Sequence, residues 1–163
     1  MVQPVDKRVV ELLNDALTLE LTVTNTYFLH ARMLDNWGLP KLGKVFYDIS
    51  IGEMKDADAL INRILMYDGH PNVQRLGAIT VGETAEEILT LAFESEKVAV
   101  AQFTASAREC RELGDAGTAA VFEQMVLDEE GHADYFESQL DAIRLVGAQR
   151  YLAQQIDSGS APA

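Results

Sequence analysis

Apolar residues recur every three or four positions through most of this chain, and residues that end helices fall in only a few places. This spacing matches one face of an α-helix and not the alternation of a strand. Glycine and proline mark the interruptions between the periodic stretches. The pattern predicts an all-α fold with four long helices and a short one, over about 7–36, 41–67, 84–113 and 118–146, with the short segment around Tyr151.

The segment between the second and third predicted helices, 70–82, carries Pro71, Gly77 and Gly82 and has no helical period. A connection of this length can return along a bundle, whereas a short turn makes neighbouring helices antiparallel. We therefore expect a four-helix bundle with one long crossover and a short fifth C-terminal helix. Residues 1–156 are expected to form a single domain, and the tail over 157–163 is rich in Ser, Gly, Ala and Pro and is predicted to be disordered.

Charge and cysteine content exclude several classes of function. The net charge of −13 repels nucleic acid and anionic membranes and attracts cations. Cys110 has no second cysteine with which to form an intramolecular disulfide, which favours a reducing compartment. No apolar signal core follows Met1, and no apolar run approaches the roughly 18 residues of a membrane span. We expect a cytoplasmic protein.

Each of the four long helices carries an acidic side chain inside its apolar stripe. The first contributes Glu20 and the third Glu96. A carboxylate removed from water is costly unless it is paired or binds a metal. Four such interruptions, one on each long helix, therefore predict a cluster that holds cations.

On the second and fourth helices the polar residues come in pairs three positions apart, Glu53 with Asp56 and Glu129 with His132. Residues at i and i+3 project from one helix face, so each pair can offer two ligands to one centre. Carboxylate and imidazole ligands suit iron or manganese, and glutamates with Glu-x-x-His pairs mark ferritin-like dimetal bundles. We predict a dinuclear centre, with no catalytic groups beyond its metal ligands: Glu20, Glu53, Asp56, Glu96, Glu129 and His132.

Several segments resemble the bacterioferritins over about Val5 to Tyr151. They are Asn-Thr-Tyr-Phe-Leu-His-Ala-Arg-Met at 25–33, Asn-Trp-Gly-Leu at 36–39, Ile-Gly-Glu-Met-Lys at 51–55, Asp-Glu-Glu-Gly-His at 128–132 and Gly-x-x-x-Tyr-Leu at 147–152. The resemblance implies a hollow shell of twenty-four chains that stores ferric mineral, with the short helix near the fourfold axes. It also implies that the centre is a di-iron ferroxidase, to which all the predicted ligands except Asp56 match residue by residue.

Asp56 stands where the family has a histidine. It adds a fifth carboxylate, so the empty site has more mutual repulsion and should retain protons more strongly. Two outcomes remain open: Asp56 ligates one iron directly or through water, or one metal position is lost. Ile49 also departs from the family pattern. It stands where the resemblance places a polar, iron-binding residue on the inner surface of the shell.

The second predicted helix has another apolar line, formed by Tyr47, Ile51, Met54, Ile61 and Leu65. A helix with two apolar faces needs two partners, so we expect this line to face another subunit. The resemblance implies haem b at a twofold subunit interface, with its iron held by Met54 from each chain, for the reduction and release of stored iron. By the same resemblance, Tyr27 donates an electron to the centre during iron oxidation. The resemblance also implies a polar pore through the shell, lined by Asn36, Asp68, Asp134 and Asp141.

Two other functions stay open. A haem-binding structural subunit with an impaired centre could assemble with a competent paralogous bacterioferritin subunit, and Asp56, Ile49 and Gly52 favour this alternative. A dimetal oxidase or peroxidase without storage fits less well, because the 147–152 ending suits a shell. A ferredoxin-type electron donor is a further candidate partner of the homo-oligomer.

Overall fold

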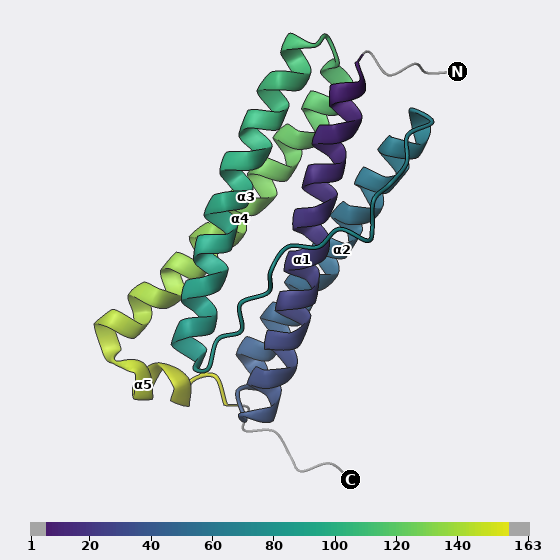
Figure 1. Cartoon of the computed structure of the whole chain (residues 1–163). Coiled ribbons are helices and arrows are strands. Elements are labelled where there is room, and N and C mark those ends of the chain that lie inside the picture. Colours follow the sequence, from purple (N-terminus) through teal and green to yellow (C-terminus); the bar gives the residue numbers. More distant parts are fainter. Residues whose placement is uncertain (1–5, 157–163) are drawn as a thin grey trace.

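Four long helices run side by side and a short fifth helix lies at one end of them in the computed structural model of the chain, which describes residues 6–156 (Figure 1). The helices are α1 (Lys7–Asn36), α2 (Pro40–Met66), α3 (Ala85–Glu112), α4 (Ala116–Val146) and α5 (Ala148–Ala153). The predicted all-α, ferritin-like bundle is confirmed. The predicted tail, 157–163, lies outside the described residues.

A long segment without helix connects α2 to α3 and follows the length of the bundle (Figure 1). Short turns join α1 to α2 and α3 to α4, so each of these pairs is antiparallel. Because the crossover returns along the bundle, α2 and α3 run in the same direction (Figure 1). This is the one-crossover arrangement that the length of the segment predicts.

Local chemistry explains where the helices begin and end. Thr84 precedes α3 and its hydroxyl accepts from the backbone N–H of Glu87 at 3.1 Å. Asp115 precedes α4 in the same way, and its carboxylate accepts from the backbone N–H of Thr118 at 2.8 Å. Because of this cap, α4 begins at Ala116, whereas the sequence pattern predicts a start at Thr118. At the end of α4, Gly147 takes a φ of 84°, a conformation that side chains disfavour.

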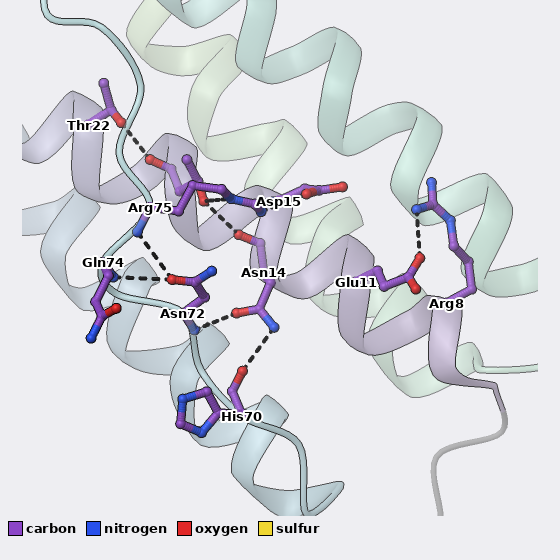
Figure 2. Close-up of polar contacts among 10 residues, drawn as sticks. Arg8, Glu11, Asn14, Asp15, Thr22, His70, Asn72, Gln74 and Arg75 are labelled. Atoms are coloured by element: carbon purple, nitrogen blue, oxygen red, sulfur yellow. Dashed lines mark hydrogen bonds and ion pairs between the residues drawn. The ribbon is translucent and has the colours of Figure 1, made fainter.

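The crossover is attached to α1 by side-chain hydrogen bonds (Figure 2). Asn14 donates from Nδ2 to the carbonyl of His70 at 3.1 Å and accepts at Oδ1 from the N–H of Asn72 at 2.7 Å. Further along, Arg75 pairs with Asp15 at 2.7 Å. These contacts keep the crossover over α1.

Buried side chains form two apolar cores. One core contains Leu17 and Met125, and the other contains Val23 and Phe136. Between these cores, each long helix places an acidic residue in the interior, as Glu20 shows by its position between Leu17 and Val23. The interior of the bundle is therefore apolar, then acidic, then apolar along its length. Among the helices in the described part of the chain, none is both long enough and apolar enough to cross a membrane.

Candidate metal centre

The bundle brings all six predicted ligands together in two overlapping groups of four residues. Within each group, every residue offers one ligand atom, and these atoms lie within 4.8 Å of one another. The first group is Glu20, Glu53, Asp56 and Glu129, and the second is Glu53, Glu96, Glu129 and His132. Glu53 and Glu129 belong to both groups, so each is placed to bridge two cations. Ligation itself stays a prediction.

Burial of the six residues differs between the two sides of the bundle. Glu20, Glu53, Glu96 and Glu129 each have 2% or less of their surface exposed. Asp56 is only partly buried, and the side chain of His132 is 26% exposed. These two residues belong to α2 and α4, so the more exposed ligands of the centre lie on that pair of helices, whereas the ligands on α1 and α3 are buried.

Three carboxylate oxygens in the centre are buried without a hydrogen-bond partner. They are both oxygens of Glu53 and Oε1 of Glu129. Of these, only Oε1 of Glu53 has an ion-pair partner, Nδ1 of His132 at 3.2 Å, which does not have the geometry of a hydrogen bond. An unpaired polar atom in a dry interior costs free energy, and an ionised carboxylate costs more. A cation bound among these oxygens removes that cost, so the arrangement of unpaired atoms fits a metal site.

The imidazole of His132 lies among three carboxylates. Its Nδ1 is 3.2 Å from Oε2 of Glu129, 3.2 Å from Oε1 of Glu53 and 3.8 Å from Oε2 of Glu96. Burial alone lowers the pKa of His132, but the carboxylates outweigh burial and raise it to about 12. The ring therefore carries a proton that a metal must displace before His132 can bind it.

The carboxyl groups hold their protons more strongly than free side chains do. Burial, reinforced by the charges of neighbouring carboxylates, raises the pKa of Asp56 to about 7. Burial also raises the pKa of Glu129 to about 8, against the hydrogen bond with His132, which lowers it. The pKa of Glu20 is raised well above its ordinary value by burial and by the charges of Glu53 and Glu129. Metal binding near neutral pH therefore releases protons.

Tyr27 connects the centre to one of the apolar cores. Its hydroxyl donates a hydrogen bond to Oε1 of Glu96 and lies 3.3 Å from the carbonyl oxygen of Ala92. Its ring packs edge-on against Phe46, with centroids 5.5 Å apart. Burial, and then the charge of Glu96, raise the pKa of Tyr27 well above its ordinary value. The phenol therefore stays protonated and fixes the orientation of Glu96.

One neighbour of the centre was not singled out by the sequence. The negative charge of Asp128 on α4 contributes to the raised pKa of Asp56 on α2. Asp128 itself is exposed, so its position within the helix carries no burial signal. Its proximity to Asp56 depends on how α2 and α4 pack, which residue spacing within one helix does not reveal.

The second apolar line of α2 lies on the surface of the single chain. Met54 is 48% exposed, Leu65 is 53% exposed and Tyr47 is 37% exposed. Arg32 of α1 stacks over the Tyr47 ring, with its guanidinium carbon 5.1 Å from the ring centre. A thioether on an exposed apolar face fits a haem ligand shared with another chain, although the second thioether must come from that chain.

The four candidate pore residues, Asn36, Asp68, Asp134 and Asp141, are exposed. Asn36 ends α1, whereas Asp68 follows the end of α2 at the opposite end of the bundle (Figure 1). One chain therefore cannot bring them together, and a pore that uses them needs several subunits. Ile49 lies on α2, partly buried against the core that contains Phe136.

The chain is similar to known proteins along nearly its whole length. Residues 10–146 match the ferritin-like domain of the ferritin family. The bacterioferritin of Brucella melitensis biotype 1 is 41% identical over 146 residues, which cover 90% of this chain and 91% of that protein. The bacterioferritin of Mycolicibacterium paratuberculosis is 42% identical over 149 residues, or 91% of this chain and 94% of its own length. The solved structure of Mycobacterium tuberculosis bacterioferritin, BfrA, matches with a TM-score of 0.93 at 38% identity and covers 96% of this chain and 98% of its own.

Proposed function

The chain belongs to the bacterioferritin family of ferritin-like proteins, and from this we propose that it stores and detoxifies iron. Each subunit oxidises Fe(II) at the six-residue centre, and the Fe(III) product is kept as mineral inside a hollow 24-mer shell built from dimers. The observation that carries the proposal is the pair of overlapping ligand groups, with Glu53 and Glu129 common to both and three of their oxygens buried without partners.

In this proposal the ligand residues divide the work according to their positions. Glu53 and Glu129 would hold both iron ions, because both groups contain them. Glu20 and Asp56 would complete the ligands of one iron, and Glu96 and His132 would complete those of the other. Iron binding displaces the protons that burial holds on the carboxyl groups, so uptake is coupled to proton release.

Two Fe(II) ions bound together match the electron demand of the oxidant. Each Fe(II) gives up one electron, and two electrons with two protons reduce O2 to H2O2, or H2O2 with two protons to two waters. The protein contributes geometry and negative charge, which favour the more highly charged Fe(III) product. The partly exposed side between α2 and α4 is the route by which Fe(III) leaves the centre.

Rapid-mixing oxidation of Fe(II) by the purified homomer tests this function. We expect a fast phase whose amplitude matches the number of centres, before slower mineral growth. Glu129→Gln should remove the fast phase because it takes away a bridging carboxylate. The adjacent and exposed Glu130→Gln is the matched control and should keep it. A fast phase that is the same in both variants would contradict the proposed centre.

A second candidate function is favoured by Asp56. If the loss of the histidine impairs the centre, the chain is a haem-binding structural subunit that assembles with a competent paralogous subunit. The native homomer would then lack the fast phase, and Asp56→His would restore it. A fast phase in Asp56→His would show that only the missing histidine impairs the centre. Its absence would show that the rest of the centre cannot oxidise iron either.

We also propose that haem b lies at the twofold interface between subunits, held by Met54 of each chain. Haem supplies a one-electron redox group that carries electrons toward the stored Fe(III). The residues of this chain supply the thioether and the exposed apolar line around it, and a ferredoxin-type protein is the proposed donor. Function in the cytoplasm belongs to the same proposal.

A further inference from the structure

A pocket of about 420 Å³ lies between α1, α3 and the crossover, which passes over α1 on its way to α3 (Figure 1). We call it the α1–α3 pocket, and its lining residues include Thr22, Tyr27, Ala92 and Val98. Tyr27 is only 1% exposed, so its ring lies at the inner end of the pocket. The Tyr27 hydroxyl donates to Glu96, one of the proposed ligands. A single side chain therefore separates the pocket from the centre.

The α1 wall of the pocket carries three threonines that follow each other at intervals of four residues, Thr18, Thr22 and Thr26. Each hydroxyl donates to the carbonyl oxygen four residues earlier on α1, at 3.1, 2.6 and 2.7 Å respectively. The hydroxyls of Thr18 and Thr22 also accept from Arg75 and Gly77 of the crossover, both at 2.8 Å. Because the three hydroxyl protons are already used within the helix, this wall has none of them to offer to a polar ligand.

The charged residues in the lining, Asp15 and Glu94, each have a cationic partner. Arg75 of the crossover lies 2.7 Å from Asp15 (Figure 2), and Lys97 lies 3.0 Å from Glu94. These pairs cancel the negative charge at the outer edge of the pocket. Since unpaired negative charge is what draws in a divalent cation, the pocket does not favour the entry of Fe(II).

Apolar side chains from α1 and α3 complete the pocket, among them Leu19, Val23, Leu91 and Val98. Apolar cavities in proteins accept small uncharged molecules such as xenon. The reactants of the proposed oxidation are Fe(II), which is a cation, and an oxidant. Of the possible oxidants, dioxygen is apolar and needs no hydrogen bond, whereas hydrogen peroxide is polar. The chemistry of the lining therefore fits dioxygen.

We propose that the α1–α3 pocket is the entry through which dioxygen reaches the centre, passing beside the ring of Tyr27. This inference rests on the proposed function, because dioxygen takes two electrons from two Fe(II) ions, together with two protons, and becomes hydrogen peroxide. The more exposed ligands, Asp56 and His132, lie on α2 and α4. Metal ions and dioxygen thus use different pairs of helices.

Crystals of the metal-free protein under xenon pressure test the pocket without measuring activity. Xenon is an apolar probe of spaces that admit dioxygen, and we expect it beside Tyr27 in the native protein. Val98→Trp, at a lining residue that is 57% exposed, should fill the pocket and exclude xenon. Val100→Trp is the matched control, because it makes the same change on α3 in a separate pocket of about 290 Å³ between α3 and α4. It should leave xenon in place.

Rapid mixing of the Fe(II)-loaded homomer with dioxygen tests entry directly. In Val98→Trp the second-order rate constant for dioxygen should fall by about tenfold, which is an added barrier of about 1.4 kcal/mol. A higher dioxygen concentration should recover the lost rate, because entry is slowed and the reaction at the centre is not. Oxidation by hydrogen peroxide should keep its native rate, as should both reactions in Val100→Trp. Thermal melts of each variant check that the bundle is folded.

The outcomes separate this inference from the proposed function. If Val98→Trp and Val100→Trp react with dioxygen at the same rate, the inference is wrong even where xenon binds, and the proposed function stands. An equal fall with hydrogen peroxide in Val98→Trp would show a disturbed centre and would also contradict a route for dioxygen. If the native homomer has no fast phase with either oxidant, the proposed function fails and the inference fails with it.

Discussion

The hydroxyl of Tyr27 is the contact through which the packed interior holds Glu96 in position. Tyr27→Phe keeps the buried ring and removes only this hydrogen bond. We expect the fast phase of Fe(II) oxidation to slow by about tenfold with unchanged amplitude, because outer partners of ligands tune rate and affinity. Tyr47→Phe, at an exposed ring on α2, is the control. A native rate in Tyr27→Phe would show that the contact only fills space.

Protonation at Asp56 and Glu129 makes the stability of the metal-free protein depend on pH. Their folded pKa values are raised to about 7 and about 8, so both groups retain protons after the unfolded chain has lost them. Stability gained in this way is complete below the ordinary carboxyl pKa and is lost as the pH rises through the folded values. The folded pKa of His132 is raised to about 12, so its proton also stabilises the folded chain. That stabilisation decreases as the pH rises above the ordinary pKa of histidine.

The melting temperature of metal-free protein should therefore fall from about pH 5 to about pH 8. Asp56→Asn should flatten this dependence, because the amide has no proton to lose. Asp58→Asn, on the exposed face of the same helix, should melt with the native dependence. Saturating Fe(II), added without oxygen, should also flatten the dependence, since the metal binds the ionised side chains. A melting temperature that rises over this range would contradict the assigned pKa shifts.

At the scale of single residues, the sequence was sufficient to select the six residues that the bundle brings together and insufficient to describe their environment. Glu20 and Glu96 stood out because each interrupts an apolar stripe. The sharing of Glu53 and Glu129 between two groups depends on how the helices pack, which the spacing within one helix does not contain. The partial exposure of Asp56 and its proximity to Asp128 have the same origin.

Among the helical elements, the end of α2 is joined to the turn before α4 by a polar network. Asp115 accepts from the hydroxyl of Tyr67 at 2.6 Å and pairs with Arg63 at 3.4 Å. It also caps α4, so one carboxylate serves two elements. Asp115→Ala removes the cap and the carboxylate that Arg63 and Tyr67 share, and leaves both to the hydroxyl of Thr118.

We expect Asp115→Ala to destabilise the subunit by about 3 kcal/mol, from the lost cap and the unpaired buried groups. For a chain of this size that corresponds to a melting temperature lower by about 6 to 12 °C. Asp58→Ala, at an exposed aspartate, should change it by no more than about 2 °C. Equal effects in the two variants would show that the network contributes nothing to stability.

The bounds of the elements were predictable where a stop or a cap is visible in the chain. Helix α1 has the predicted bounds, and α2 and α3 differ from prediction by one residue at each end. Helix α4 begins two residues before the predicted start. Gly117 is a poor helix former, but the cap at Asp115 outweighs its effect. The path of the crossover over α1 was not predictable, since it depends on contacts such as Asn14 with Asn72.

In the whole molecule, the exposed line around Met54 predicts the site of haem. Met54→Ala should abolish the Soret absorption of the purified shell while its size stays native, because the substitution removes the proposed ligand and little buried surface. Met66→Ala, at another exposed methionine of α2, is the control and should retain haem. Full haem occupancy in Met54→Ala would exclude the proposed axial ligand.

The division of the interior into two apolar cores has a consequence for thermodynamic coupling. Destabilising changes at distant sites with no shared partners add, so Leu17→Ala and Phe136→Leu, one in each core, should show additive losses in the metal-free protein. Cations that cross-link the carboxylates from all four long helices give the two cores common partners. Loading with metal should then couple the two sites, so that the losses caused by the same pair of changes no longer add.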